Sequence, residues 1–282
     1  MIQAPAIRLT YLMGKHRMLP NFVQECYIGF SGGYLIMENF YCQPFLLNPF
    51  TGEELLFPKP PLSFNCVSPH DRVILASMPS KDFVLLALSM GNKNLQVFLA
   101  RDSVWDVYTY VKEPWMLVDI VVLDGRAYVV TNKGQLGFLS LSPLNLTFLE
   151  IKNITPTLNS FNLKLVTSDQ QLLMVDFIPG HNLAVYRMGF LGMEWVKIDS
   201  LGDQALFCGG RSGSELRKPG RWGGRSNCVY YIDSVSKCYM YSMDATLIEG
   251  FRIEETSSGS PLLPLYWYYP HQYCNTHQLQ DE

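Results

Sequence analysis

A pair of short strand-like runs joined by a turn recurs five times along the 282-residue chain, and this repeat constrains the fold more than any other feature. The copies begin at Phe45, Val97, Gly137, Ala184 and Tyr239, so their starts are separated by 52, 40, 47 and 55 residues. From the second copy onward, a further pair of such runs precedes each unit. Four strands per period of about 40–55 residues are typical of the blades of a β-propeller.

The runs themselves have the composition of β-strands. From residue 27 onward, stretches of four to eight residues rich in Val, Ile, Leu, Tyr and Phe alternate with Gly, Pro, Asn, Asp and Ser; examples begin at Arg72, Phe83, Asp119 and Leu172. β-branched and aromatic residues bounded by turn residues indicate strands. No long amphipathic helical pattern interrupts them, so we predict an all-β chain.

Two consecutive β-sandwiches are the alternative architecture, because one sandwich needs only seven to nine strands in about 100 residues. The repeat crosses every position at which such a chain could be divided, and no Pro-rich or charged linker lies in the middle. We therefore predict one β-propeller of four-stranded antiparallel blades. Five blades are preferred, and six are also compatible with the period.

The predicted propeller domain spans residues 26–270, between an N-terminal extension at 1–25 and a C-terminal tail at 271–282. A propeller must close, because an open ring leaves two unpaired sheet edges. One of two strand-like segments, 26–29 or 265–269, should complete the first blade.

Composition and charge exclude several classes of protein. With 48% hydrophobic residues the chain is too apolar to be disordered. Its 22 basic and 25 acidic residues give a net charge of −3, so no overall field attracts nucleic acid or an acidic membrane surface. No run approaches 18 consecutive apolar residues, as a membrane-spanning helix requires. We expect neither a nucleic-acid nor a membrane partner.

The compartment is predicted from the cysteines and the N-terminal segment. Seven cysteines without a C-x-x-C spacing indicate reduced core residues in a reducing compartment, so we expect the cytoplasm or nucleus. The segment before Glu25 contains Arg8, Lys15, His16 and Arg17 and no acid. That composition resembles an organellar transit peptide, which makes the mitochondrion or plastid the alternative.

The sequence contains no motif that identifies catalytic residues. Residues 29–33 satisfy the G-x-S-x-G pattern around Ser31, but a strand follows instead of the helix that a nucleophile elbow requires, so a tight turn is the preferred interpretation. The five histidines are scattered without metal-ligand spacing, and no phosphate-binding glycine motif is present. We predict a non-enzyme with no cofactor and no metal.

One segment, residues 209–225, departs from the strand pattern. This Gly-rich stretch contains five cationic side chains and one acid, Glu215, together with a tryptophan. A loop of this length in a compact domain is usually functional or disordered, and Arg and Trp are enriched at interface hot spots. A solvated, mobile loop is the alternative. The predicted residues for binding an acidic or phosphorylated patch of a partner protein are Arg211, Arg217, Lys218, Arg221 and Trp222.

Several ordered motifs resemble a known family. They are residues 34–37, residues 46–52 with a Leu-Phe-Pro-x-Pro ending, residues 119–130, residues 171–175, the Leu-Gly-Asp-x-Ala-Leu-Phe string at 201–207 and residues 224–231. Over about residues 26–270 the chain is similar to the plant F-box-associated β-propellers, long catalogued as a domain of unknown function, which include the "kink suppressed" (KIB-type) regulators of brassinosteroid signalling.

The resemblance implies an F-box protein, in which an N-terminal helical F-box docks on a cullin-type ubiquitin ligase and the propeller holds the substrate. The segment before Cys26 is Pro-containing, irregular and shorter than an F-box. We therefore expect a truncated or F-box-less member, some of which are organellar, that binds the ligase adaptor only if an F-box is supplied elsewhere.

The predicted function is a non-catalytic protein-binding module whose substrate, by family resemblance, is a kinase or another regulator. The rival is an enzyme that uses the central funnel of the propeller. Carboxylates or histidines converging on that funnel would favour the enzyme, whereas an apolar or basic rim would favour the binding module.

Overall fold

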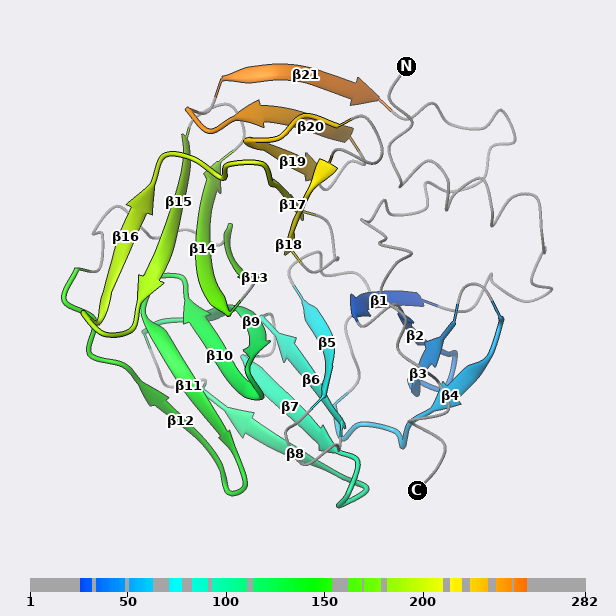
Figure 1. Ribbon diagram of the computed structural model, residues 1–282. Coiled ribbons are helices and arrows are strands. Elements are labelled where there is room, and N and C mark those ends of the chain that lie inside the picture. Colours follow the sequence, from blue (N-terminus) through cyan, green and yellow to red (C-terminus); the bar gives the residue numbers. More distant parts are fainter. Residues whose placement is uncertain are drawn as a thin grey trace.

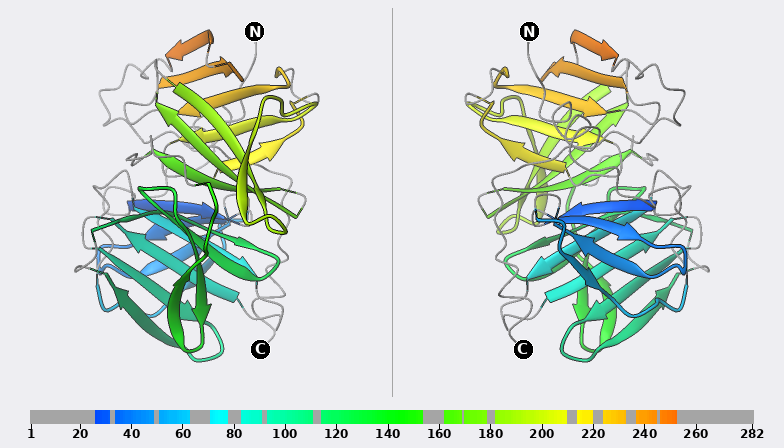
Figure 2. Two further views of the ribbon diagram at one scale, coloured as in Figure 1. Left: turned by 90° about the vertical axis from the view of Figure 1, so that its left-hand side faces the viewer. Right: turned by 90° about the vertical axis from the view of Figure 1, so that its right-hand side faces the viewer.

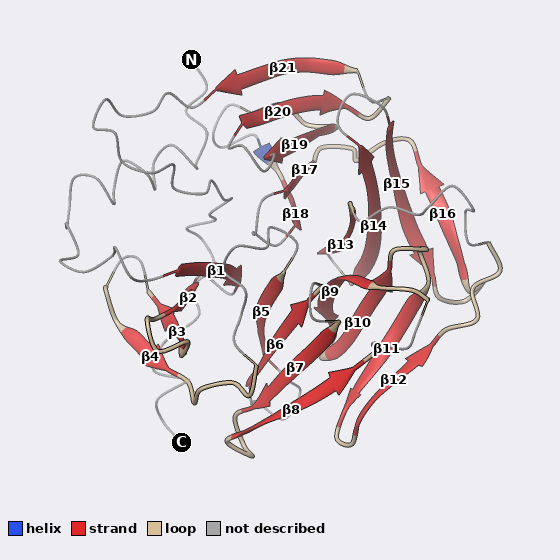
Figure 3. Ribbon diagram, turned by 180° about the vertical axis from the view of Figure 1, so that it is seen from behind, coloured by secondary structure: helices blue, strands red, loops and turns tan. Residues whose placement is uncertain are grey.

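The computed structural model describes residues 26–252 except for short internal gaps. These gaps are residues 32–33, 49–50, 63–70, 78–82, 91–92, 111–113, 154–161, 169, 179–181, 210–213, 220–223, 233–236 and 245. The described strands are arranged around a central axis (Figure 1), and they account for nearly all of the regular structure (Figure 3). The all-β propeller predicted from the repeat is confirmed.

Four blades are four-stranded antiparallel sheets in which consecutive strands are neighbours. Blade 1 consists of β1 (Cys26–Ser31), β2 (Tyr34–Glu38), β3 (Pro44–Leu47) and β4 (Glu54–Leu56). Blade 2 consists of β5 (Arg72–Ser77), β6 (Phe83–Ser89), β7 (Asn94–Leu99) and β8 (Val104–Thr109). Blade 3 consists of β9 (Leu117–Leu123), β10 (Arg126–Thr131), β11 (Leu136–Leu141) and β12 (Leu144–Phe148). Blade 4 consists of β13 (Leu163–Ser168), β14 (Gln171–Ile178), β15 (Asn182–Gly189) and β16 (Glu194–Ile198).

Blade 5 departs from the predicted antiparallel pattern. It consists of β17 (Ala205–Gly209), β19 (Cys228–Ile232), β20 (Lys237–Ser242) and β21 (Leu247–Arg252), and β17 runs parallel to β19. An additional strand, β18 (Ser214–Arg217), lies between them in the sequence. It pairs antiparallel with β17 and parallel with β13, so that blades 4 and 5 form one continuous sheet of nine strands.

The repeat predicted from the sequence corresponds to equivalent strands. The five marker residues all lie in the third strand of their blades: Phe45 in β3, Val97 in β7, Phe138 in β11, Val185 in β15 and Tyr239 in β20. Segment 26–29 falls in β1 and completes the first blade, whereas segment 265–269 lies outside the described residues. The described part of the chain therefore makes five blades.

Apolar clusters hold neighbouring blades together, and each cluster combines buried side chains of two adjacent blades. Successive residues of a strand serve different clusters. In β14, Leu172 and Met174 face blade 3, whereas Leu173 and Val175 face blade 5. Because side chains alternate across a strand, a sheet buried on both faces is apolar at consecutive positions, as this sequence is.

Ring closure rests on the cluster shared by the first and last described blades. Leu35 and Met37 of β2 belong to the same continuous cluster as Phe207 of β17 and Met240 of β20. Figure 2 shows the ring from its two sides, with β21 at the top and blades 1 to 3 in the lower half. The other clusters join blades 1 and 2, 2 and 3, 3 and 4, and 4 and 5.

A close approach between blades 1 and 2 gives a first test of this packing. A Cβ atom added at Gly29 of β1 would lie 2.4 Å from the backbone oxygen of Val73 in β5. Because backbone cannot move aside as a side chain can, we expect Gly29→Ala to lower the free energy of unfolding by about 2 kcal/mol or more. Urea unfolding measures it. The control is Gly250→Ala in outer β21, where the nearest atom, from Tyr239, is 3.4 Å away; equal losses would contradict the close inner packing.

Candidate functional site

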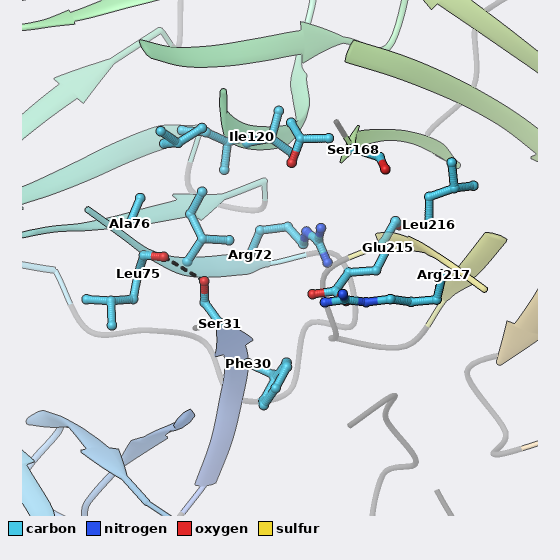
Figure 4. A pocket seen from close by; sticks show the side chains of 15 residues that line it. Phe30, Ser31, Arg72, Leu75, Ala76, Ile120, Ser168, Glu215, Leu216 and Arg217 are labelled. Atoms are coloured by element: carbon cyan, nitrogen blue, oxygen red, sulfur yellow. Dashed lines mark hydrogen bonds and ion pairs between the residues drawn. The ribbon is translucent and has the colours of Figure 1, made fainter. Parts of the chain in front are cut away.

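A cavity of about 300 Å³ lies where the inner strands of blades 1 to 4 meet β18 (Figure 4). Its walls come from β1, β5, β9, β13 and β18, so side chains far apart in the sequence converge on the axis. Apolar wall residues include Phe30, Ile74 and Ile120, and the charged ones are Arg72, Glu215 and Arg217. This cavity corresponds to the central funnel expected of a propeller.

A buried ion pair braces the funnel. Arg72 Nε donates a hydrogen bond of 2.6 Å to Asp119 Oδ1, and the two side chains are 2% and 0% exposed. The second carboxylate oxygen of Asp119 accepts a hydrogen bond of 2.7 Å from the backbone N–H of Leu165. Charge-assisted hydrogen bonds are stronger than neutral ones. One carboxylate therefore ties together β5, β9 and β13, the inner strands of blades 2, 3 and 4.

A lysine lies close to this pair. Burial lowers the pKa of Lys164 in β13 to about 8; the carboxylate of Asp119 opposes that shift, and the guanidinium of Arg72 adds to it. Burial also raises the pKa of Cys208 in β17 to about 12, with Lys164 acting in the opposite direction. A thiol with so high a pKa is protonated and unreactive at neutral pH. Cys208 is therefore not a candidate nucleophile at neutral pH.

A second ion pair lines the cavity from β18. Arg217 donates to Glu215 Oε2 through both Nε and Nη2 at 2.8 Å. The two residues are two positions apart, so they lie on the same face of the strand. Figure 4 shows the Arg72 side chain extending from β5 toward the side of the cavity that Glu215 and Arg217 occupy. The described lining thus holds two cations and one carboxylate.

Ser31 has a structural contact. It ends β1, and β2 begins at Tyr34 as the antiparallel partner, so the preferred turn interpretation holds and a strand-to-helix elbow is excluded. The Ser31 hydroxyl donates a hydrogen bond of 2.6 Å to the backbone oxygen of Leu75, which joins blade 1 to blade 2. All five histidines lie outside the described residues. Within the part that is described, no group of three or more His, Cys, Asp or Glu side chains could hold a metal ion.

Two of the five predicted partner-binding residues are described. Arg217 ends β18 and Lys218 follows it, whereas Arg211, Arg221 and Trp222 lie outside the described residues. The prediction of a plain loop at 209–225 is wrong over β18, because Ser214–Arg217 finds backbone partners on both β13 and β17. A substitution at Arg217 therefore touches a strand.

Two described cations of this segment, Arg217 and Lys218, each have an acidic neighbour. Lys218 Nζ lies 2.7 Å from Asp203 Oδ2, and both side chains are about 70% exposed. The hydrogen bond from Lys218 lowers the pKa of Asp203. Asp203 belongs to the Leu-Gly-Asp string at 201–207. Lys218 and Arg217 are thus each paired with an acid of the same chain.

Sequence reasoning did not single out Arg72 and Asp119 as site residues, although both begin strand-like runs that it identified. Asp119 carries the one available signal, a charge within the apolar stretch 117–123. A charge at a position buried on both sides requires a partner. The pattern does not show which of the chain's cations supplies it.

Two comparisons with known proteins complete the description. A family model described as the KIB1-4 beta-propeller matches residues 10–252. No curated protein matches the chain. In the described residues, no helix is long and apolar enough to cross a membrane.

The buried pair can be tested by removing one charge. Asp119→Ala leaves the guanidinium of Arg72 and the N–H of Leu165 without their acceptor, so we expect a loss of about 3–5 kcal/mol in the free energy of unfolding. The double variant Arg72→Met, Asp119→Leu should recover part of it, because the guanidinium that Asp119→Ala leaves without its carboxylate is then absent. Denaturant unfolding measures both.

The control for Asp119 is Asp102, whose ion pair with Arg101 is about half exposed on both sides. Surface pairs contribute about 1 kcal/mol or less, so Asp102→Ala should have little effect. A small effect of Asp119→Ala, equal to that of the control, would contradict the bracing role.

Lys164 predicts a pH dependence of stability. The folded protein holds its pKa near 8 against an ordinary value of 10.5, so between these values the unfolded chain binds more protons and the stability contributed at Lys164 rises with pH. Cys208 acts in the opposite direction above its ordinary pKa of 9. The comparison with Lys164→Met isolates the lysine, because that variant retains Cys208.

We expect the unfolding free energy of the wild type, relative to Lys164→Met, to increase as the pH rises from 8 toward 10. Urea unfolding at several pH values measures the difference. A difference that does not change with pH, or that decreases, would show that the ammonium is not disfavoured in the folded protein.

Proposed function

The chain belongs to the KIB1-4 β-propeller family, and from this premise we propose that it is a non-catalytic protein-binding module that recognises an acidic or phosphorylated surface of a partner protein. One observation carries the proposal. Strand β18, which belongs to none of the five four-stranded blades, ends at Arg217; Lys218 follows it directly, and each of these cations is paired with an acid. A rigid ring that presents an added segment suits recognition, because binding residues concentrate where a scaffold positions variable segments.

The cations of this segment differ in accessibility. The side chain of Lys218 is 70% exposed, whereas that of Arg217 is 36% exposed and lines the cavity. Of these two cations, Lys218 is therefore the better placed to meet a partner, and Arg211, Arg221 and Trp222 extend the proposed patch by sequence. An incoming phosphate or carboxylate competes with Asp203 for Lys218. Salt bridges between exposed groups are screened by salt, so binding should weaken as ionic strength rises.

The contacts in the funnel support a binding role over a catalytic one. The carboxylate of Glu215 accepts from two nitrogen atoms of Arg217, and the hydroxyl of Ser31 donates a hydrogen bond to the backbone oxygen of Leu75. A serine nucleophile needs a neighbouring general base to take its proton, and a backbone carbonyl is not such a base. The arrangement favours holding a ligand rather than transferring a proton.

We further propose that the bound partner is a substrate of a cullin-type ubiquitin ligase, such as a kinase or another regulator, with the F-box supplied by another segment or another chain. The family resemblance motivates this part of the proposal. An affinity pull-down of the intact chain, scored for kinases and for ligase subunits, identifies the partner with which the site is then measured.

The test of the site uses charge reversal at an exposed position. Lys218→Glu should weaken capture of the purified partner about tenfold or more, which corresponds to about 1.4 kcal/mol, because a carboxylate there repels an acidic surface. The control is Lys197→Glu, an exposed lysine on outer β16. Binding is measured by titration at two salt concentrations, and thermal unfolding confirms that both variants fold. Unchanged affinity in Lys218→Glu, or equal losses in both variants, would contradict the site.

A further inference from the structure

The region around the axial cavity carries an excess of positive charge. Its lining contains Arg72 and Arg217 against Glu215. Behind the lining, Asp119 pairs with Arg72, and Lys164 lies near both of them. These described groups comprise three cations and two carboxylates. The low dielectric of a partly enclosed site strengthens each of these fields, so the cavity favours an anion.

A buried hydroxyl lies beside the cavity. Ser214 is 8% exposed and lines the cavity from β18, and its Oγ makes no hydrogen bond within the described part of the chain. The Oγ atom has almost no accessible surface, so it lies behind the cavity wall and does not open onto the cavity. Thr167 and Ser168 line the cavity from β13 beside it.

The rest of the lining limits the size and character of an occupant. Ile74, Ile120 and Leu216 add apolar surface to the polar groups. The volume of about 300 Å³ is at the lower end of the range for small-molecule sites, which combine apolar walls with a few polar groups that fix orientation. A large cofactor would not fit, whereas a molecule the size of a single ring would.

We propose that the axial cavity binds a small molecule with one oxyanion, a carboxylate or a phosphate monoester, on a compact apolar body. The oxyanion accepts hydrogen bonds from the guanidinium of Arg217, in the field of Arg72, and the apolar body contacts Ile74 and Leu216. Guanidinium groups suit both oxyanions, because their N–H groups match the spacing of two oxygens. Glu215 competes with the ligand for Arg217.

This site is separate from the protein-binding proposal, although both involve Arg217. Docking of a partner depends on exposed Lys218, whereas binding of the small ligand is opposed by Glu215. The two failures are therefore distinguishable: the protein-binding proposal fails if Lys218→Glu leaves partner capture unchanged, and the small-ligand proposal fails if neither anion binds.

Isothermal titration of the full chain tests the proposal with three probes of similar size. Phenyl phosphate and benzoate carry the two oxyanions on one ring, and benzamide is the neutral control. We expect at least one of the two anions to bind with millimolar affinity or better and benzamide to bind at least about tenfold more weakly. The anion that binds more tightly identifies which oxyanion the natural ligand carries.

Single substitutions in the cavity wall test whether the anion binds in this cavity. Arg217→Gln should weaken binding of the anion about tenfold or more, and Glu215→Gln should strengthen it because the internal competitor is gone. The matched control is Arg101→Gln, an arginine whose ion pair with Asp102 lies on the surface away from the cavity. It should leave the affinity unchanged.

Opposite effects of Glu215→Gln and Arg217→Gln cannot arise from a general loss of structure, so the pair remains informative even if Arg217→Gln lowers stability. The proposal is overturned if neither anion binds, if benzamide binds as well as the anions, or if Arg101→Gln weakens binding as much as Arg217→Gln. Weaker binding in Glu215→Gln would also overturn it.

Discussion

Packing of sheet against sheet around the ring is the interaction on which the rest of this structure depends. Each blade buries apolar side chains on both faces, and each cluster needs residues from two blades. Burial of apolar area is the dominant favourable contribution to folding, so no blade is independent of its neighbours. Ring closure through β2, β17 and β20 gives the first and last described blades the same protection as the others.

The inner strands of the sheets converge on the axis, and both the close packing at Gly29 and the cavity lie there. The inner strands approach closely enough that Gly29 has no room for a side chain against Val73. There the apolar packing gives way to a buried carboxylate, Asp119, which satisfies Arg72 and a backbone N–H of the next blade. Such a bridge fixes three strands relative to one another because each partner would be costly to leave unpaired. The cavity lies within this braced frame.

The segment at 209–225 connects the fold to the proposed functions. Its strand β18 joins blades 4 and 5, lines the cavity with Ser214 and Glu215, and leads directly to exposed Lys218. One inserted strand therefore serves the interior and the surface of the ring. The ion pairs of Arg217 and Lys218 within the chain mean that any anionic ligand or partner must compete with an existing carboxylate, which favours selectivity over raw affinity.

The sequence by itself determined the all-β class, the four-stranded period and the equivalence of Phe45, Val97, Phe138, Val185 and Tyr239. These are local properties, because strand propensity, turn residues and burial on both faces are written into neighbouring positions of the chain. Only the tertiary structure decided that β18 pairs with β13, that β17 runs parallel to β19 and that Asp119 takes Arg72 as its partner. Each of those contacts joins residues or strands far apart along the chain or reverses the expected strand direction. No local pattern specifies such a partner, because the choice depends on how the packed blades bring distant edges and charges together.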